Sequence, residues 1–225
     1  MNTKEQRSLI YSCLMGDGGL NKFITKSKGT RYNSLTICHS ENQYDYLYYK
    51  ADLLNKCTVL SKGGVIRDKL TVYKGKKFNQ KTVSFTDVNY FSILGKRFYI
   101  NNKRSAKNVL KYIYTDLSLA ILFMDDGGIY RRKKKHKDGT QYYLKPSGVL
   151  NTRAFSYEDI MLIKEWLLST YGIVSNVQRH KGKYYIIWLN KANMYKVWCI
   201  IRKYVKLIPS MVDKFDLCVD FYGLE

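Results

Sequence analysis

The chain carries one short string twice, and this repeat limits the folds it can adopt. An apolar run ends in an aspartate followed by two glycines at residues 14–20 and again at residues 123–129. The two aspartates, Asp17 and Asp126, lie 109 residues apart in a chain of 225, which is close to half its length. Repetition on this scale predicts two similar half-domains and a pseudo-twofold molecule, which suits a partner with near-twofold symmetry of its own.

The charge balance indicates what that partner is. The chain has 39 Lys and Arg against 18 Asp and Glu, a formal net charge of +21. Such self-repulsion is typical of proteins that neutralise a polyphosphate, so nucleic acid is the expected partner. No run reaches the roughly 18 apolar residues of a spanning helix, and no membrane partner is expected. A hydrophobic content of 45% with 2 prolines predicts a folded core.

The repeated strings predict two buried helices. Thr3 with Gln6 forms a capping-box start for the first helix. Thr115 or Asp116 can cap the second, which spans residues 117–124 and is almost entirely apolar. The glycine pair of each string is expected to end its helix. Because a helix that is apolar on every side is normally buried on every side, we expect each motif helix to pack against the other.

The same order of elements is predicted after each motif, namely two strands, a helix, two strands and a closing helix. In the first half these lie at 21–30, 32–40, 41–54, 65–73, 82–87 and 88–94. In the second half they lie at 129–135, 141–151, 156–169, 173–179, 184–190 and 192–205. The expected fold is α+β, with two pseudo-symmetric αββαββα half-domains at 1–100 and 115–225 joined by a segment at 101–114. Their antiparallel sheets would form a DNA-binding saddle.

Basic and amide side chains concentrate on the predicted strands and turns. Alternation with Ile, Val, Leu and Tyr would place them on one sheet face, wide enough for a duplex major groove. Asn33, Gln141, Tyr143, Asn176, Gln178 and Arg179 are expected to contact bases. The remaining candidate DNA-binding residues are Lys22, Lys26, Lys28, Arg31, Arg67, Lys69, Lys74, Lys76, Lys77, Lys81, Arg131, Arg132, Lys133, Lys135, Arg153, Lys181 and Lys183. Any one residue of the run 131–137 is as consistent with a solvated turn as with a phosphate contact.

The two aspartates predict a metal site. Each stands at the C-terminal end of a buried helix, where the helix dipole disfavours a carboxylate. A divalent cation such as Mg²⁺ (or Mn²⁺) removes this conflict, because carboxylates and backbone carbonyls are the hard oxygen ligands it prefers. An aspartate that merely caps a turn is the alternative, which two copies with matched flanks make less attractive. The candidate metal-holding residues are Asp17, Asp126, Gly16 and Asp125.

A metal beside a polyanion-binding face suits phosphodiester hydrolysis, with one scissile phosphate near each aspartate. On these residues the chain resembles the LAGLIDADG homing endonucleases in their single-chain, two-motif form. It is most similar to the type encoded in yeast mitochondrial introns, whose second motif also reads Phe-Met-Asp-Asp-Gly-Gly. Residues 99–104 and 207–214 resemble, respectively, that type's Asn-Asn-Lys-Lys segment and its Leu-Ile-Pro stretch near the C-terminus.

The resemblance implies one catalytic basic residue in each half. Lys214 lies 88 residues after Asp126, while Lys103 and Arg104 lie 86 and 87 residues after Asp17. Both Lys103 and Arg104 remain candidates for the counterpart of Lys214 in the first half. An arginine would give electrostatic support but would not carry a proton, because it does not deprotonate.

The implied function is site-specific, metal-dependent double-strand DNA cleavage by a monomer at a long, nearly asymmetric site. It would leave short 3′ overhangs and promote intron mobility. One rival is an RNA maturase on the same fold, which would bind its host intron. Another is a DNA-binding regulator without catalysis, although the presence of both aspartates favours the nuclease. An intron-encoded protein of this kind would act in a mitochondrion or chloroplast, and otherwise in the cytoplasm or nucleoid.

Overall fold

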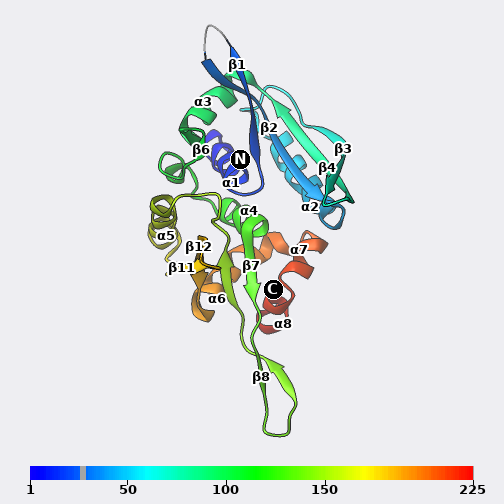
Figure 1. The fold of residues 1–225 in the computed structure, drawn as a ribbon, viewed down its shortest axis with the longest axis vertical. Helices are drawn as coiled ribbons and strands as arrows, with labels where there is room; N and C mark the ends of the chain where they lie inside the picture. Colours follow the sequence, from blue (N-terminus) through cyan, green and yellow to red (C-terminus); the bar gives the residue numbers. More distant parts are fainter. Residues whose placement is uncertain (26–28, 225) are drawn as a thin grey trace. The chain divides into compact units, whose positions relative to one another are not determined.

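The computed structural model describes residues 1–25 and 29–224 and resolves into two compact units, Met1–Ile121 and Leu122–Glu225. The boundary falls inside the second motif helix, α4 (Asp116–Asp126), so its first half belongs to the first unit (Figure 1). Within the described residues, no helix has both the length and the apolar character needed to cross a bilayer.

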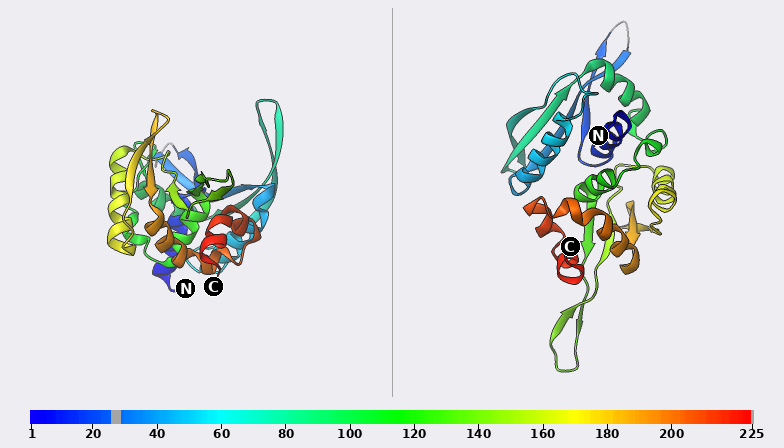
Figure 2. Two further views of the ribbon diagram at one scale, coloured as in Figure 1. Left: turned by 90° about the horizontal axis from the view of Figure 1, so that it is seen from below. Right: turned by 180° about the vertical axis from the view of Figure 1, so that it is seen from behind.

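The first unit is an antiparallel sheet with helices packed on one face. Its strand order is β1-β2-β4-β3, with α2 and α3 against β2 (Figure 2). The elements before α4 are α1 (Thr3–Met15), β1 (Gly19–Thr25), β2 (Gly29–Ser40), η1 (Glu41–Gln43), α2 (Tyr44–Asn55), β3 (Val65–Tyr73), β4 (Lys76–Thr86), α3 (Val88–Phe98), β5 (Tyr99–Ile100), β6 (Lys103–Arg104) and η2 (Leu110–Tyr112).

The second unit repeats this plan with a sheet of order β11-β12-β10-β7. Its elements are β7 (Gly127–Tyr130), β8 (Lys133–Lys135), β9 (Gln141–Tyr143), β10 (Ser147–Leu150), α5 (Tyr157–Tyr171), β11 (Asn176–His180), β12 (Tyr184–Leu189), α6 (Lys191–Val205), α7 (Pro209–Lys214) and α8 (Asp216–Tyr222). The predicted α+β class, with an antiparallel sheet in each half, is therefore confirmed.

Two of the predicted strands are wrong in the second half. The segments expected at 129–135 and 141–151 are each broken in two, and β8 and β9 pair only with each other in a separate hairpin that projects from the unit (Figure 1). All residues of β8 and β9 are exposed. Since neither face of this hairpin is buried, nothing forces its strands to continue in line with the main sheet.

The expected burial of the motif helices is confirmed. Leu9 to Met15 of α1 are at most 1% exposed, and Ser118 to Met124 of α4 are at most 2% exposed. Within the first unit, the hydroxyl oxygens of Ser8 and Ser118 lie 2.7 Å apart. This buried hydrogen bond joins α1 to the first half of α4, and it needs a small side chain on each helix where the two meet.

The cap predicted for α1 is wrong by one residue. Asn2, not Thr3, is the N-cap, and its Oδ1 accepts from the backbone N–H groups of Lys4 and Glu5. Glu5 completes the capping box by accepting from the Asn2 N–H. Asn and Thr are both good caps, and the carboxylate three residues after Asn2 favours the earlier start. At α4, Thr115 caps by accepting from the Ser118 N–H at 3.1 Å.

Gly95→Ala is expected to destabilise the first unit. A Cβ at Gly95 of α3 would lie 2.1 Å from Cδ2 of Tyr32, whose ring is buried and stacked on Tyr99 at 5.3 Å. Overpacking of this kind costs about 1–3 kcal/mol, more than the ~1 kcal/mol that alanine gains over glycine in a helix. Urea unfolding followed by circular dichroism measures the change. Gly19→Ala, which meets nothing within 4 Å, is the matched control, and equal stability of both variants would contradict the packing argument.

Candidate functional site

The first motif aspartate lies in a tight reversal between α1 and β1. The Gly16 N–H donates to the Ser12 carbonyl and the Gly18 N–H donates to the Cys13 carbonyl at 2.7 Å. A Cβ at Gly18 would lie 2.5 Å from that same carbonyl oxygen, so only glycine fits directly after Asp17. The reversal leaves the Asp17 side chain 37% exposed, while the glycines on either side of it are buried.

The second motif aspartate also precedes a turn that only glycine fits. A Cβ at Gly127 would lie 2.4 Å from the Phe123 carbonyl oxygen, so glycine is required directly after Asp126 as well. The Asp126 carbonyl accepts from the backbone N–H and the side-chain amide of Asn151, at 2.9 and 3.1 Å. Asp126 is half-buried. The repeated Asp-Gly pair is thus a steric requirement in both units.

A positively charged side chain donates hydrogen bonds to carbonyl oxygens at the end of each motif helix. In the first unit the Arg104 guanidinium donates to the carbonyls of Gly16 at 2.9 Å and Gly18 at 2.8 Å. In the second unit Lys214 Nζ donates to the carbonyls of Met124 at 2.6 Å and Asp125 at 3.0 Å. Cations are favoured there because the C-terminal end of a helix carries partial negative charge. Lys103, the other candidate of the first half, is exposed.

These contacts bear on which oxygens could hold a metal. The carbonyl oxygens of Gly16 and Asp125, both candidate ligands, already accept hydrogen bonds from Arg104 and Lys214. The partly exposed carboxylates of Asp17 and Asp126 offer hard oxygen donors that Mg²⁺ or Mn²⁺ accepts. Taken separately, each helix end therefore fits a divalent cation. The carboxylates of Asp17, Asp125 and Asp126 offer charged oxygens, and each hydrogen-bonded carbonyl keeps a second lone pair.

A buried polar cluster that the sequence reasoning missed lies beside Asp17. His39, near the end of β2, is 4% exposed, and its Nδ1 lies 3.9 Å from Asp17 Oδ2. Its Nε2 lies 3.0 Å from Nζ of Lys50, which is fully buried on α2. Nδ1 also lies 3.2 Å from Gln43 Oε1. The sequence feature that could have indicated this cluster is Lys50, which stands at one of the otherwise apolar positions of its helix.

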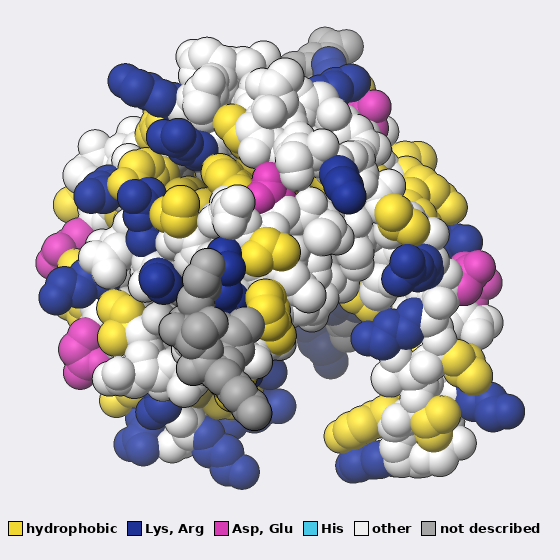
Figure 3. Space-filling model, turned by 90° about the horizontal axis from the view of Figure 1, so that it is seen from above, with side chains coloured by type: hydrophobic (Ala, Val, Ile, Leu, Met, Phe, Trp, Pro, Cys, Tyr) yellow, Lys and Arg dark blue, Asp and Glu magenta, His cyan; other side chains and the backbone are white. Residues whose placement is uncertain are grey.

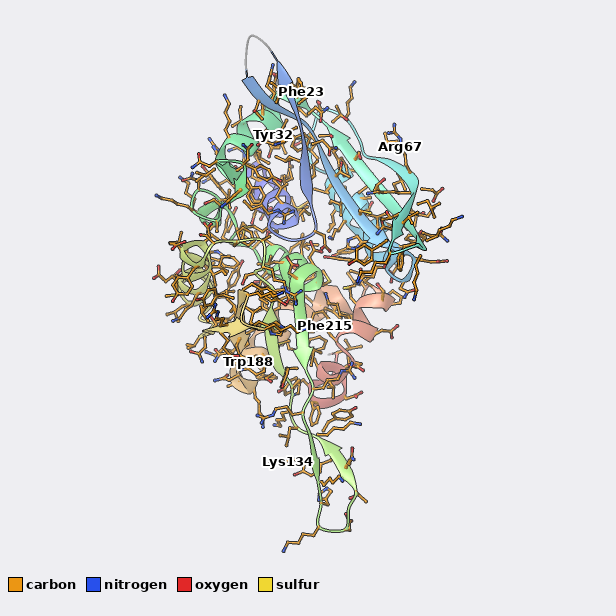
Figure 4. All side chains as sticks on the ribbon, viewed as in Figure 1. Phe23, Tyr32, Arg67, Lys134, Trp188 and Phe215 are labelled. Atoms are coloured by element: carbon orange, nitrogen blue, oxygen red, sulfur yellow. The ribbon has the colours of Figure 1, made fainter. Side chains whose placement is uncertain are left out.

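The face of the first sheet opposite the helices presents polar and basic residues. Thr36 and Ser84 meet there with their hydroxyl oxygens 3.1 Å apart, and the Asn21 amide donates to Thr36. The register places Arg67 opposite Thr82 and Lys69 opposite Gln80 on this same face. Figure 4 shows Arg67 on β3 at the edge of the sheet. This surface can lie along a polyanion.

Of the basic residues predicted for that face, Lys81 lies on the helix-covered one and Arg31 is bound by residues of α3. Lys81 is opposite the buried His39, stands over the Tyr44 ring of α2 at 5.2 Å and donates to Asp68 at 2.7 Å. The hydrogen bond with Asp68 raises the pKa of Lys81. Arg31 donates to Asn89 Oδ1 and Ser92 Oγ, both on α3. Sheet register and local partners, which the sequence did not reveal, direct these side chains.

The second sheet has a hollow of about 460 Å³ on its open face. Gln178, one of the predicted base-contacting residues, lines it, and Asn176 is opposite Trp188 in the register. Arg179 lies on the helix-covered side, since it is opposite Tyr185, whose ring contacts Tyr157 of α5 at 4.8 Å. Arg132, a predicted DNA-binding residue, also lines it. The lining residues that the sequence reasoning missed are Tyr130, Val149, Asn151, His180, Ile186 and Trp188. Alternation along β11 and β12 could have indicated His180, Ile186 and Trp188.

Most of the other predicted DNA-binding residues are exposed on strand ends and turns. Figure 4 labels Lys134 on the projecting hairpin, and the face drawn in Figure 3 carries many Lys and Arg but few Asp and Glu. Arg131 pairs with Asp216 at 2.7 Å, the Asn33 side-chain oxygen accepts from Ser34, and Arg153 stacks on Tyr184. Lys26 and Lys28 lie outside the described residues. The exposed set comprises Lys22, Lys74, Lys76, Lys77, Lys133, Lys135, Gln141, Tyr143, Lys181 and Lys183.

Comparison with known proteins identifies the family. The model of the LAGLIDADG DNA endonuclease family matches residues 7–197. This chain belongs to that family. Because the match spans both motifs, the predicted resemblance is confirmed.

Two curated proteins are similar to this LAGLIDADG chain over most of its length. A probable intron-encoded endonuclease 1 from Wickerhamomyces canadensis is 28% identical over 214 residues, covering 93% of this chain and 83% of the relative. A protein RecA from Mycolicibacterium chitae is 28% identical over 182 residues, covering 79% of this chain. The chain spans less than half the length of the RecA relatives it matches, 38% and 48%.

The structure of the homing endonuclease I-WcaI bound to its DNA recognition sequence has the same fold as this LAGLIDADG chain. The two align with a TM-score of 0.71 at 22% identity, over 94% of this chain and 85% of the other. At this identity the likeness establishes the architecture, namely two halves of mixed helix and antiparallel sheet.

Proposed function

We propose that the chain is a site-specific double-strand DNA endonuclease that needs a divalent metal, Mg²⁺ or Mn²⁺. It recognises a long, nearly asymmetric site as a monomer, leaves short 3′ overhangs and promotes mobility of an intron. The observation that supports this most directly is the matched end of each motif helix. In each unit an aspartate lies at the end of the motif helix, a glycine fits the turn directly after it, and a basic side chain donates to carbonyls beside it.

Asp17 and Asp126 hold the metal, and each serves one scissile phosphate. A bound divalent cation supplies activation of water and stabilisation of the charge on the phosphate and the departing 3′ oxygen. Arg104 adds positive charge near the first phosphate without exchanging a proton, and Lys214 can both add charge and move a proton near the second. The two strands are therefore cut by chemically unequal halves.

The open sheet faces bind the duplex. Arg67 and Lys69 of the first unit contact phosphates, while Asn176 and Gln178 of the second reach base edges. If the chain is encoded in an organellar intron, its target lies in the uninterrupted host gene of that compartment.

Incubation with DNA that spans the uninterrupted host gene tests the function. A linear product with Mg²⁺ and only binding with Ca²⁺ is the expected result. RNA binding without DNA cleavage would favour a maturase that assists splicing of its host intron, and DNA binding without cleavage in any divalent metal would favour a regulator.

Binding is expected to weaken steeply with salt. Each neutralised phosphate contributes about 0.9 to the slope of log affinity against log salt on duplex DNA. Lys69→Ala, on the open face, should lower that slope by about 1. Lys81→Ala, on the helix-covered face and paired with Asp68, should leave it unchanged. Fluorescence anisotropy in Ca²⁺ over a salt series measures the slope for each variant. An affinity that does not change with salt would contradict the DNA-binding role of the basic sheet faces.

A further inference from the structure

Lys50 occupies a position where a lysine is normally unfavourable. The buried residues of α2 are Tyr46, Leu47, Lys50, Ala51 and Leu54, which follow helical spacing. Lys50 is 0% exposed. Burying an ammonium group is costly unless partners compensate for the lost water, so its contacts indicate why it is there.

Lys50 is linked to Asp17 through His39. Nζ lies 3.0 Å from His39 Nε2 and 4.3 Å from the centre of the Tyr46 ring. On the other side of the imidazole, Nδ1 lies 3.2 Å from Gln43 Oε1 and 3.9 Å from Asp17 Oδ2. The imidazole therefore stands between a buried ammonium and a motif carboxylate, with all of these residues inside the first unit.

The two neighbours of His39 agree on where its proton sits. An ammonium donates only, so Nε2 must accept from Lys50. The Gln43 side-chain oxygen accepts only, so Nδ1 must donate to it. We infer that Lys50 fixes His39 as the Nδ1–H tautomer, so that His39 is a positioning residue for the Asp17 carboxylate and not a metal ligand.

This inference rests on the proposed function for its consequence. A protonated Nδ1 has no lone pair for a metal. Its N–H, which donates to Gln43, places partial positive charge 3.9 Å from the Asp17 carboxylate and stabilises it there. At 3.9 Å the contact is electrostatic rather than a direct hydrogen bond. The carboxylate oxygens of Asp17 are then held ready for a cation by groups that do not compete for it.

The second half has other residues at the positions of His39 and Lys50. Gly19 pairs with Thr36 and Gly128 with Val149, so His39 corresponds to Thr152, three residues further along. Thr152 is buried and donates to the Tyr185 carbonyl at 3.0 Å. The burial patterns of α2 and α5 place Ile163 at the position of Lys50. The Lys50–His39 pair is thus expected to act on one strand of the DNA.

The tautomer is measured by ¹⁵N NMR of the full chain, without DNA or metal. The chain has three histidines, and His39→Gln assigns the His39 signals by their disappearance. We expect a protonated Nδ1 and an unprotonated Nε2 in the wild type at a pH of about 8, where an ordinary imidazole is neutral. Lys50→Met should produce a mixture of tautomers, because the Gln43 amide can then turn and offer its NH2 group to an unprotonated Nδ1. A protonated Nε2 in the wild type, or an unchanged pure Nδ1–H form in Lys50→Met, would overturn the inference.

Strand-resolved cleavage of end-labelled DNA tests the consequence. Lys50→Met should slow one strand by about tenfold or more relative to the other, since loss of an outer-shell partner typically costs 10–100-fold. Lys56→Met, an exposed lysine after the same helix that pairs with Asp52, is the control and should keep the wild-type ratio. Equal slowing of both strands would reject the one-sided role. A wild type that cuts neither strand would reject the proposed function, while the NMR result would still decide the tautomer.

Discussion

Asp17→Asn and Asp126→Asn are each expected to abolish double-strand cleavage and to leave DNA binding intact. The amide keeps the shape of the side chain and removes the charge that attracts a metal. A bound metal supplies several kcal/mol of transition-state stabilisation, so its loss should reduce the rate by on the order of 10³-fold or more. Both aspartates are partly exposed and both turns are set by glycines, so the fold should survive either change.

Conversion of a supercoiled plasmid with one target site measures this loss, and anisotropy in Ca²⁺ measures binding. Asp52→Asn is the matched control, because Asp52 is an exposed carboxylate paired with Lys56, and a surface pair of this kind contributes little to stability. Linear product from either motif variant at the wild-type rate would refute the role given to the aspartates. Loss of binding together with cleavage would instead indicate that the turn had been disrupted.

The parts of the fold that the sequence predicted best are those where burial alone decides the structure. The two apolar strings had to be buried helices, since a helix with no polar side has no face for water. The hairpin of β8 and β9 was mispredicted because its residues were taken as parts of the longer strands at 129–135 and 141–151, while neither face of the hairpin is covered. The cap of α1 depended on which of two suitable residues lay three positions before a glutamate.

The candidate site was also predicted only in part from the sequence. The family resemblance implied one catalytic basic residue in each half, Lys103 or Arg104 and Lys214, and the structure shows the carbonyls that Arg104 and Lys214 bind. Spacing could not choose Arg104 over Lys103, because adjacent strand residues point to opposite faces. Lys50 and His39 lie on different elements, and only the packing of α2 on β2 brings Nζ to Nε2. Lys81 and Arg31 were assigned to the open face because side-chain partners such as Asp68 and Ser92 come from other strands and helices.

The two helix-end cations are expected to differ in what they contribute. Lys214→Met should slow the strand served by Asp126 by about 10²-fold or more, the range typical of a lost general acid or base. Lys214→Arg keeps the charge and the reach to the carbonyls of Met124 and Asp125, but an arginine cannot release a proton. It should therefore recover binding and stability and leave most of the rate loss in place. Full recovery of the rate would show that charge alone is needed.

Lys196→Met is the matched control for the structural part of this effect. Lys196 also donates to a carbonyl at a helix end, that of Gly172 after α5, at 3.0 Å. A cation in such a place contributes about 0.3–1 kcal/mol, so Lys196→Met and Lys214→Met should lose similar stability in urea. Only Lys214→Met should change the ratio of the two strand rates. If both variants slow both strands alike, Lys214 acts as a helix cap, and the catalytic difference between the halves must lie in Arg104 and the residues around Asp17.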